Sequence, residues 1–171
     1  ITGFINFIGR RIMGTRAAVG KILPDGSYDM TYIHYDGYPK GVGVTLENCV
    51  GSLQLNELLR IGHIRSLSTT TKLFNGAECE DIDWQDIKDN QRIHGSAEQY
   101  RNLHEVANVF ADCDYVYVWC DNRWHVSHMR MDWENKTNWL TPFVKVTDVL
   151  KADGSFDWDA LERKHMFEEI A

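Results

Sequence analysis

Basic side chains are scarce in this sequence of 171 residues, where 18 Lys and Arg stand against 25 Asp and Glu and give a formal net charge of −7. General binding to nucleic acid or to an anionic membrane depends on clustered Lys and Arg, so this balance argues against both. A local basic pocket remains compatible with it. The sequence also lacks an apolar run of membrane-spanning length and a secretory signal peptide. We therefore expect no membrane association and a location in the cytoplasm.

The sequence also lacks cysteine and histidine residues at the spacings that are typical of metal sites. The four cysteines, at positions 49, 79, 113 and 120, are too widely spaced for a zinc site or a disulfide framework, so we expect reduced thiols. His125 and His128 lie on a predicted strand, where a separation of three residues places side chains on opposite faces. Such a pair suits a metal ion poorly. We predict neither a metal site nor a cofactor.

Familiar catalytic motifs are missing too. The chain contains no Gly-x-Ser-x-Gly, phosphate-binding P-loop, Rossmann fingerprint or His-Glu-x-x-His. The best remaining chemistry is His34 oriented by Asp36, with Tyr35 or Tyr38 as an acid, which would suit a small hydrolase or lyase. A histidine and a carboxylate on one strand face are also an ordinary structural pair. Enzymatic activity therefore stays open, and binding without catalysis is favoured.

Two stretches of the sequence predict β-hairpins. Residues 16–23 and 28–36 flank the turn sequence Pro24-Asp25-Gly26-Ser27, and residues 115–119 and 124–128 flank Asp121-Asn122-Arg123. Arg16 would lie at the open end of the first hairpin, where Asp36 also emerges. We predict either an Arg16–Asp36 ion pair or a phosphate contact, because the planar guanidinium suits bidentate recognition of anions.

The most informative stretch is 32–43, where the first hairpin runs into a loop rich in glycine and aromatic residues. Alternation places Tyr32, His34 and Asp36 on one strand face. A helix is expected to begin near residues 42–45, and its first amides would favour an anion. The alternative is that the aromatic residues close the core and the glycines only form the turn. The predicted ligand-binding residues are Arg16, Tyr32, His34, Asp36, Tyr38, Lys40, Gly41 and Gly43.

Helical spacing of apolar residues recurs in three further places. Residues 42–61 predict one or two short helices, broken near Gly51-Ser52 and ended at Gly62. The capping-box sequence at 96–99 predicts a helix of about four turns, and a last helix is expected over about 158–170. Together these elements predict an α+β fold: an antiparallel sheet of about four strands, formed by two hairpins, with helices on one face and a C-terminal helix.

The predicted strand 115–119 has aromatic side chains on one face. Tyr115, Tyr117 and Trp119 alternate with valines. If helices cover the valine face, the aromatic face could stack on a base. Otherwise these rings are buried against the C-terminal segment.

The chain divides into three parts by composition. Residues 1–12 form an N-terminal extension before Met13, and residues 13–150 form a single α+β domain. Within it, residues 66–95 are polar, irregular and acidic and predict a flexible insertion. Residues 151–171 form a helical tail that packs on the body or on a neighbouring subunit, so a homo-oligomer is expected.

Three motifs carry a resemblance to a known family. They are Met13-Gly14-Thr15-Arg16, then Tyr32-x-His34-Tyr35-Asp36-Gly37-Tyr38-Pro39, and Leu59-x-Ile61-Gly62-x-Ile64-x-Ser66-Leu67. This pattern resembles a family of small uncharacterised proteins of tailed bacteriophages that open with Met-Gly-Thr-Arg and carry a His-aromatic-Asp-Gly-Tyr-Pro motif. The resemblance covers residues 13–67 and implies a protein that acts in the cytoplasm of an infected bacterium.

The resemblance and the predicted site together suggest a protein that counters host defence. We expect it to sequester a nucleotide-derived immune signal without catalysis, by stacking the base and holding phosphates with Arg and backbone amides. The first alternative is an inhibitor that binds a host defence enzyme through the acidic residues of segment 78–89. The others are the small hydrolase or lyase that uses His34 and Asp36, and a structural component of the virion.

Overall fold

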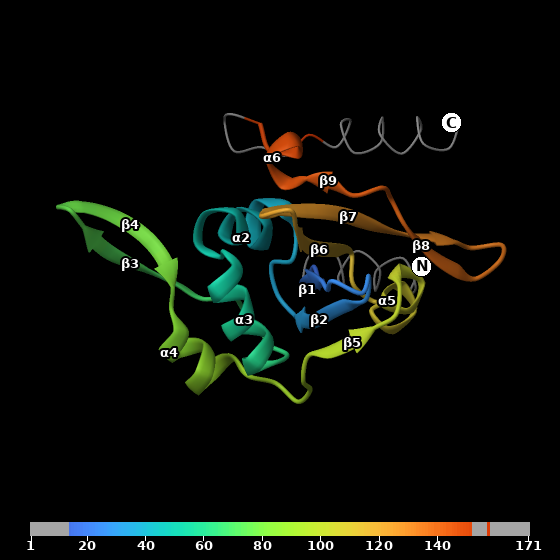
Figure 1. The fold of residues 1–171 in the computed structure, drawn as a ribbon, viewed down its shortest axis with the longest axis horizontal. Helices are drawn as coiled ribbons and strands as arrows, with labels where there is room; N and C mark the ends of the chain where they lie inside the picture. The colour runs from blue at the N-terminus through green and yellow to red at the C-terminus, as the bar shows by residue number, and fades with distance from the viewer. Residues whose placement is uncertain (1–13, 152–156, 158–171) are drawn as a thin grey trace, which may run out of the picture.

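The computed structural model describes residues 14–151 and residue 157, which form an α+β fold (Figure 1). Its centre is a seven-stranded mixed sheet in the order β5-β2-β1-β6-β7-β8, with β9 also paired to β7. The sheet curls strongly into a half barrel. Its strands are β1 (Ala17–Ile22), β2 (Tyr28–Ile33), β5 (Glu98–Tyr100), β6 (Tyr115–Cys120), β7 (Arg123–Asp132), β8 (Thr137–Leu140) and β9 (Val144–Lys145).

Both predicted hairpins are confirmed. β1 pairs antiparallel with β2, and β6 pairs antiparallel with β7. In the second turn Asp121 and Asn122 both have positive φ, 52° and 58°, as a type I′ turn requires. Short polar side chains tolerate this conformation better than others, so the local sequence determines the turn.

The sheet has more strands than predicted, and it is not purely antiparallel. β1 pairs parallel with β6, and the ladder begins at Ala17 opposite Tyr115. β7 is long enough to pair with β6 along one edge and with β8 and β9 along the other. The prediction of four antiparallel strands failed because hairpin signals are local, whereas the pairing of two hairpins is decided by distant residues.

Short helical segments connect the strands. A π-type turn, η1 (Pro39–Gly43), leads into α2 (Val44–Cys49), and α3 (Ser52–Ile61) follows. The predicted break at Gly51-Ser52 and end at Gly62 are both confirmed. Gly62 has a φ of +97°, and a Cβ there would lie 2.7 Å from the carbonyl oxygen of Gly95. The remaining segments are α4 (Trp84–Asp86), η2 (Ile87–Gln91), α5 (Leu103–Val109) and α6 (Val146–Val149).

The helix predicted from the capping box is shorter and begins later. Residues 98–100 form β5 on the edge of β2, and α5 begins after Asn102, whose side chain accepts a hydrogen bond from the Glu105 amide at 2.9 Å. The open edge of β2 offers backbone partners to this segment, and Asn102 is itself a good N-cap. The four-turn helix from Ser96 was therefore wrong.

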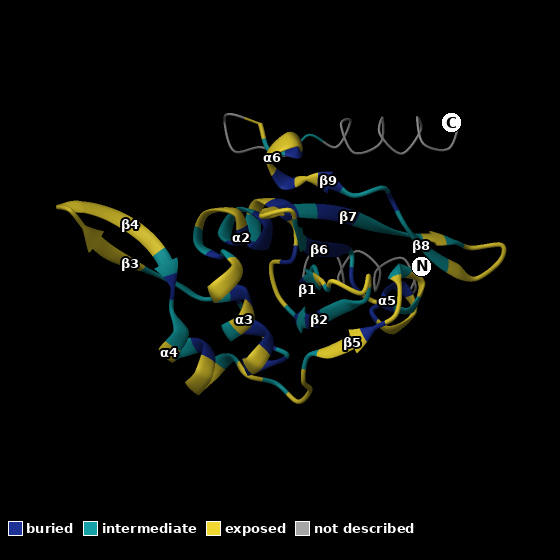
Figure 2. Cartoon of the chain, in the orientation of Figure 1, coloured by how far each residue is buried: buried dark blue, intermediate teal, exposed yellow. Residues whose placement is uncertain are grey.

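Both faces of the sheet are covered, so the prediction of helices on one face was also wrong. α2 and α3 pack on the face that carries Val19 and Tyr117, which we call the α3 face. α5 packs on the face that carries Met30 and Val116, which we call the α5 face. The apolar side chains of β6 alternate, and both sets are buried. In Figure 2, β6 and parts of β7, α3 and α5 have the dark blue colour of buried residues.

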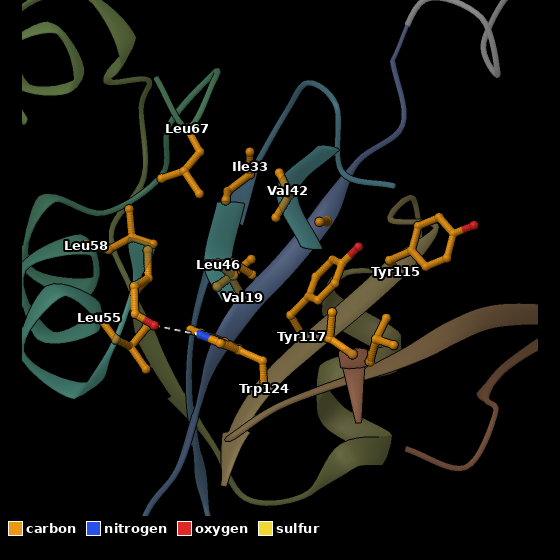
Figure 3. Packing of buried hydrophobic residues seen from close by; sticks show 14 of the residues in the cluster. Val19, Ile33, Val42, Leu46, Leu55, Leu58, Leu67, Tyr115, Tyr117 and Trp124 are labelled. Carbon is orange, nitrogen blue, oxygen red and sulfur yellow. Dashed lines mark hydrogen bonds between the residues drawn. The ribbon is translucent and has the colours of Figure 1, made fainter. Parts of the chain in front are cut away.

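The aromatic side chains of β6 do not form an open stacking platform. Tyr117 is completely buried and Tyr115 is 3% exposed. The neighbouring Trp124 is buried as well, and its indole N–H donates to the Val50 carbonyl at 2.8 Å (Figure 3). These rings are core residues covered by α2, by η1 and by the segment 144–149.

Residues 69–82 form a separate hairpin instead of an irregular insertion. It consists of β3 (Thr69–Phe74) and β4 (Ala77–Ile82) around the turn Asn75-Gly76, and it projects from the body (Figure 1). We call residues 69–82 the arm. α4 and η2 follow it.

The C-terminal part of the described chain contains a short strand followed by a short helix. β9 covers residues 144–145, and α6 covers residues 146–149. The N-terminal extension 1–12 and the helix expected over about 158–170 lie outside the described residues. No helix within the described ranges is long and apolar enough to cross a membrane.

Candidate functional site

Arg16 stands directly before β1, but its ion pair is not the predicted one. Its guanidinium lies 3.9 Å from the carboxylate of Asp112, in the α5–β6 connection. Asp36 adopts a left-handed backbone conformation with a φ of 58°, after β2 has ended, and its side chain is exposed. The predicted Arg16–Asp36 pair was wrong because the chain leaves the extended conformation before Asp36.

Tyr32 and His34 are neighbours of Arg16. The Tyr32 hydroxyl and Nδ1 of His34 lie 2.7 Å apart and share a hydrogen bond. Burial raises the pKa of Tyr32 to about 12, against the opposing effect of Arg16. Burial, followed by the Arg16 charge, lowers the pKa of His34. The structure therefore brings these three predicted residues together, in an environment that favours the neutral form of His34.

The partner of His34 differs from the one that the catalytic alternative requires. His34 is oriented by Tyr32, and within the described residues no hydrogen bond joins it to Asp36. A phenol with a pKa of about 12 is also a weak general acid near neutral pH. The expectation that Asp36 orients His34 was wrong because the chain leaves the extended conformation before Asp36, as for the predicted Arg16–Asp36 ion pair.

The loop after β2 is held against the core by its backbone. The buried hydroxyl of Tyr117 donates to the Gly37 carbonyl at 2.8 Å, and the Val42 amide donates to the Asp36 carbonyl at 2.9 Å. A Cβ on Gly37 would lie 2.8 Å from backbone atoms of Thr15 and Arg16. Close packing thus accounts for Gly37, as the structural interpretation of the loop expects.

Of the other predicted residues in this loop, the two glycines are closely packed and the two with long side chains are exposed to solvent. A Cβ on Gly41 would collide with the carbonyl oxygen of Asp36, and one on Gly43 would lie 3.3 Å from the ring of Tyr117. Tyr38 and Lys40 are exposed. The loop packs on the α3 face, whereas Tyr32 packs on the α5 face. The eight predicted residues therefore do not surround one cavity, and the role of the loop in ligand binding stays a prediction.

A cavity of about 350 Å³ opens beside Arg16. It lies between the segment before β1, the α5–β6 connection and the β7–β8 hairpin, and we call it the Arg16 cavity. Arg16 is the only one of the eight predicted residues in its lining. The charged and aromatic side chains of the lining are Arg16, Asp112, Asp114, His128, Arg130 and Trp133.

The Arg16 cavity combines charges of both signs with an exposed ring. Arg16 is 22% exposed and Asp112 is 50% exposed, so their 3.9 Å ion pair is partly open to solvent. The Nε–H of Arg16 is buried and has no hydrogen-bond acceptor in the described part of the chain. Trp133 is 75% exposed. Such a cavity can hold an anion on a guanidinium, accept hydrogen bonds on carboxylates and stack a flat ring.

Sequence reasoning missed most of this lining. Asp112 and Asp114 precede a buried strand, and Arg130 and Trp133 lie near the β7–β8 turn, so only the parallel β1–β6 pairing brings them to Arg16. Trp133, which stands beside the polar residues 134–136, was the one signal available in the sequence. No group of three or more potential metal ligands occurs among the residues that the structure describes.

No protein-family model, no curated protein and no solved structure matches this chain. Its function is therefore inferred from its own geometry.

Proposed function

We propose that this chain binds a small nucleotide-like anion in the Arg16 cavity and releases it unchanged. With the phage resemblance, the proposal extends to sequestration of a nucleotide-derived immune signal in an infected bacterium. The proposal rests on the environment of Arg16, whose partly buried guanidinium lines the cavity. The nearest carboxylate, that of Asp112, lies 3.9 Å away, and the Nε–H of Arg16 has no hydrogen-bond acceptor within the described residues.

The arginine supports binding of a phosphate or another planar anion. A guanidinium presents its N–H groups as a fixed fork, which matches two oxygens of a phosphate or carboxylate. At 3.9 Å, Asp112 is too far from the Arg16 nitrogen for a direct hydrogen bond. A ligand oxygen can therefore approach the fork without breaking a direct hydrogen bond between Arg16 and Asp112.

The other lining residues favour a nucleotide over a simple anion. Carboxylates such as Asp112 and Asp114 would repel an inorganic phosphate, but they accept hydrogen bonds from ribose hydroxyls and from amino groups of bases. The exposed indole of Trp133 offers a face on which a base can stack. A ligand that carries an anion, several donors and a flat ring satisfies all three types of side chain.

The inhibitor alternative requires an acidic surface, and several of its carboxylates have internal partners. Asp81 pairs with Lys72 at 3.0 Å, and Asp83 accepts a hydrogen bond from the Asp86 amide at 3.1 Å. Asp86 in turn accepts from the hydroxyl of Ser68 at 2.6 Å. These bonds stabilise the arm and the turn that follows it, so the Arg16 cavity supports a binding function better.

Isothermal titration calorimetry with mono-, di- and cyclic nucleotides, each matched with its uncharged nucleoside, tests the proposal. We expect nucleotides to bind and nucleosides to bind weakly or not at all. Arg16→Ala should lower the affinity about 10-fold to 150-fold, because a hydrogen bond to a charged group contributes about 1.5–3 kcal/mol. Arg60→Ala, which removes an exposed arginine on α3, is the matched control and should leave binding unchanged.

Two further measurements separate the parts of the proposal. Trp133→Ala should weaken binding while Trp133→Phe retains most of it, since phenylalanine keeps a stacking ring. Mass spectrometry of the ligand released by heat should return the nucleotide intact. Absence of nucleotide binding, or equal affinities for Arg16→Ala and Arg60→Ala when circular dichroism shows both folded, contradicts the site. An altered nucleotide contradicts binding without catalysis.

A further inference from the structure

Within the described residues, the arm contacts the body near its base. The Asp83 amide donates to the Ser68 carbonyl at 2.8 Å and closes the base, and Ile82 is buried in the core. The thiol of Cys49 donates to the Glu80 carbonyl at 3.5 Å. All residues from 71 to 80 are exposed, as the yellow ribbon in Figure 2 shows.

Both edges of the arm are open. β3 and β4 form a two-stranded sheet, so each strand has a single neighbour in the described structure. The outward N–H and C=O groups of each strand are then available to another strand. A two-stranded hairpin is marginally stable on its own in water, and a third strand is the usual remedy. Pairing with a third strand would therefore stabilise the arm.

The two edges differ in charge. β4 carries Glu78, Glu80 and Asp81, whereas β3 has the sequence Thr-Thr-Thr-Lys-Leu-Phe with no acidic residue. Pairing of β4 with its own copy would place acids opposite acids, which is destabilising. β3 has no such conflict, and its threonines and aromatic residue favour a strand. β3 is thus the edge that is compatible with a second copy of itself.

We propose that two copies of this chain associate through their arms, with β3 pairing antiparallel to β3 of the partner subunit around a two-fold axis. A two-fold perpendicular to the sheet requires one residue to lie opposite its own copy. If Thr71 takes this position, Lys72 lies opposite Thr70 of the partner subunit, and Leu73 opposite Thr69 of the partner subunit. A register centred on Lys72 would place like charges together and is disfavoured.

The proposed pairing also covers the tip of the arm. Leu73 is 76% exposed and Phe74 is 69% exposed. Antiparallel pairing carries each tip alongside the base of the partner's arm, which removes apolar surface from water. The result is a four-stranded sheet with the acidic β4 strands on its outer edges, where charged residues discourage further pairing.

This inference does not depend on the proposed ligand. The arm and the β7–β8 hairpin that lines the Arg16 cavity lie at opposite ends of the molecule (Figure 1). A variant with a shortened arm should therefore bind nucleotide as the parent chain does. A parent chain that binds nucleotide but does not self-associate contradicts the arm proposal alone, and a parent chain that self-associates without binding nucleotide contradicts the Arg16 cavity alone.

Sedimentation velocity of the full chain over a wide micromolar range is the first test. We expect a concentration-dependent dimer. Replacing residues 71–80 with Asn-Gly keeps Ile82 and the Asp83–Ser68 hydrogen bond and should give a folded monomer. A parent chain that stays monomeric throughout the range, or a shortened-arm variant that still dimerises, overturns the proposal.

A charge exchange at the two-fold axis tests the register and does not require removal of the arm. Thr71→Glu and Thr71→Lys should each weaken self-association severalfold, up to about fivefold, because each places like charges opposite one another. An equimolar mixture of the two variants should form heterodimers, since the opposite charges then face each other. Thr70→Glu and Thr70→Lys are the matched controls: Thr70 lies opposite Lys72 of the partner subunit in this register, so the first should strengthen and the second weaken self-association, with the mixture intermediate between them. Equal recovery in both pairs, or none at Thr71, refutes this register.

Discussion

The hydrogen bond from Tyr117 to Gly37 gives the most direct test of how the core holds the loop before η1. Tyr117 is fully buried, and its hydroxyl donates to the Gly37 carbonyl at 2.8 Å. Burial raises the pKa of Tyr117 well above its usual value, so the hydroxyl remains a donor throughout the working pH range. Tyr117→Phe removes this donor and keeps the ring.

Tyr117→Phe lowers the free energy of unfolding because the Gly37 carbonyl loses its hydrogen-bond donor. A buried acceptor that loses its partner costs about 1–3 kcal/mol, whereas the small volume change adds little. With a urea m-value of about 2 kcal/mol/M, the unfolding midpoint should fall by roughly 0.5–1.5 M. Tyr28→Phe is the control, because Tyr28 is only partly buried and no hydrogen bond of its hydroxyl is found within the described residues. We expect its midpoint to stay nearly unchanged.

Urea unfolding followed by far-ultraviolet circular dichroism measures both variants. Equal midpoints for Tyr117→Phe and Tyr28→Phe would refute the reasoning, because they would show that the Gly37 carbonyl finds another donor at no cost. A changed m-value would instead report a change in the surface exposed on unfolding.

Two further predictions concern residues near Arg16. Gly37→Ala should destabilise the fold by about 1–3 kcal/mol in the same urea assay, because its Cβ would lie 2.8 Å from backbone atoms, whereas Gly14→Ala, whose nearest atom is 3.7 Å away, should be neutral. His34 should titrate by NMR below its usual pKa. Because its folded pKa is lowered, its contribution to stability is complete above the unfolded pKa near 6.5 and is lost as the pH falls through the folded value. His34→Gln should flatten the loss of stability on acidification, and a slope equal to that of the parent chain would contradict this.

The elements that the sequence predicted well are those fixed by neighbouring residues. Turn residues and strand alternation were sufficient for both hairpins, and glycine positions were sufficient for the boundary between α2 and α3. By contrast, β5 forms because it lies next to the open edge of β2 in the folded chain, and the parallel ladder forms because β6 lies next to the open edge of β1. No local signal at Glu98 or Ala17 encodes that choice, so the strand number and direction could not be predicted.

The candidate site shows the same division. Alternation along β2 correctly placed Tyr32 and His34 on one side of the strand, next to Arg16. The prediction for Asp36 failed because β2 ends at Ile33 and Asp36 itself has a left-handed backbone conformation, so strand alternation no longer sets the direction of its side chain. Asp112 and Trp133 reach the cavity only through the tertiary fold.

The parallel ladder between β1 and β6 has a consequence for the order of folding. Ala17 near the start of the described chain pairs with Tyr115, so the centre of the sheet can form only after most of the chain has left the ribosome. Long-range pairing of this kind slows folding, because the connecting chain must first lose much of its freedom. Until β6 arrives, one edge of the apolar β1 strand has no partner and can pair with other chains. Aggregation during synthesis should therefore depend on how fast the segment up to β6 is translated, more than on the stability of the finished fold.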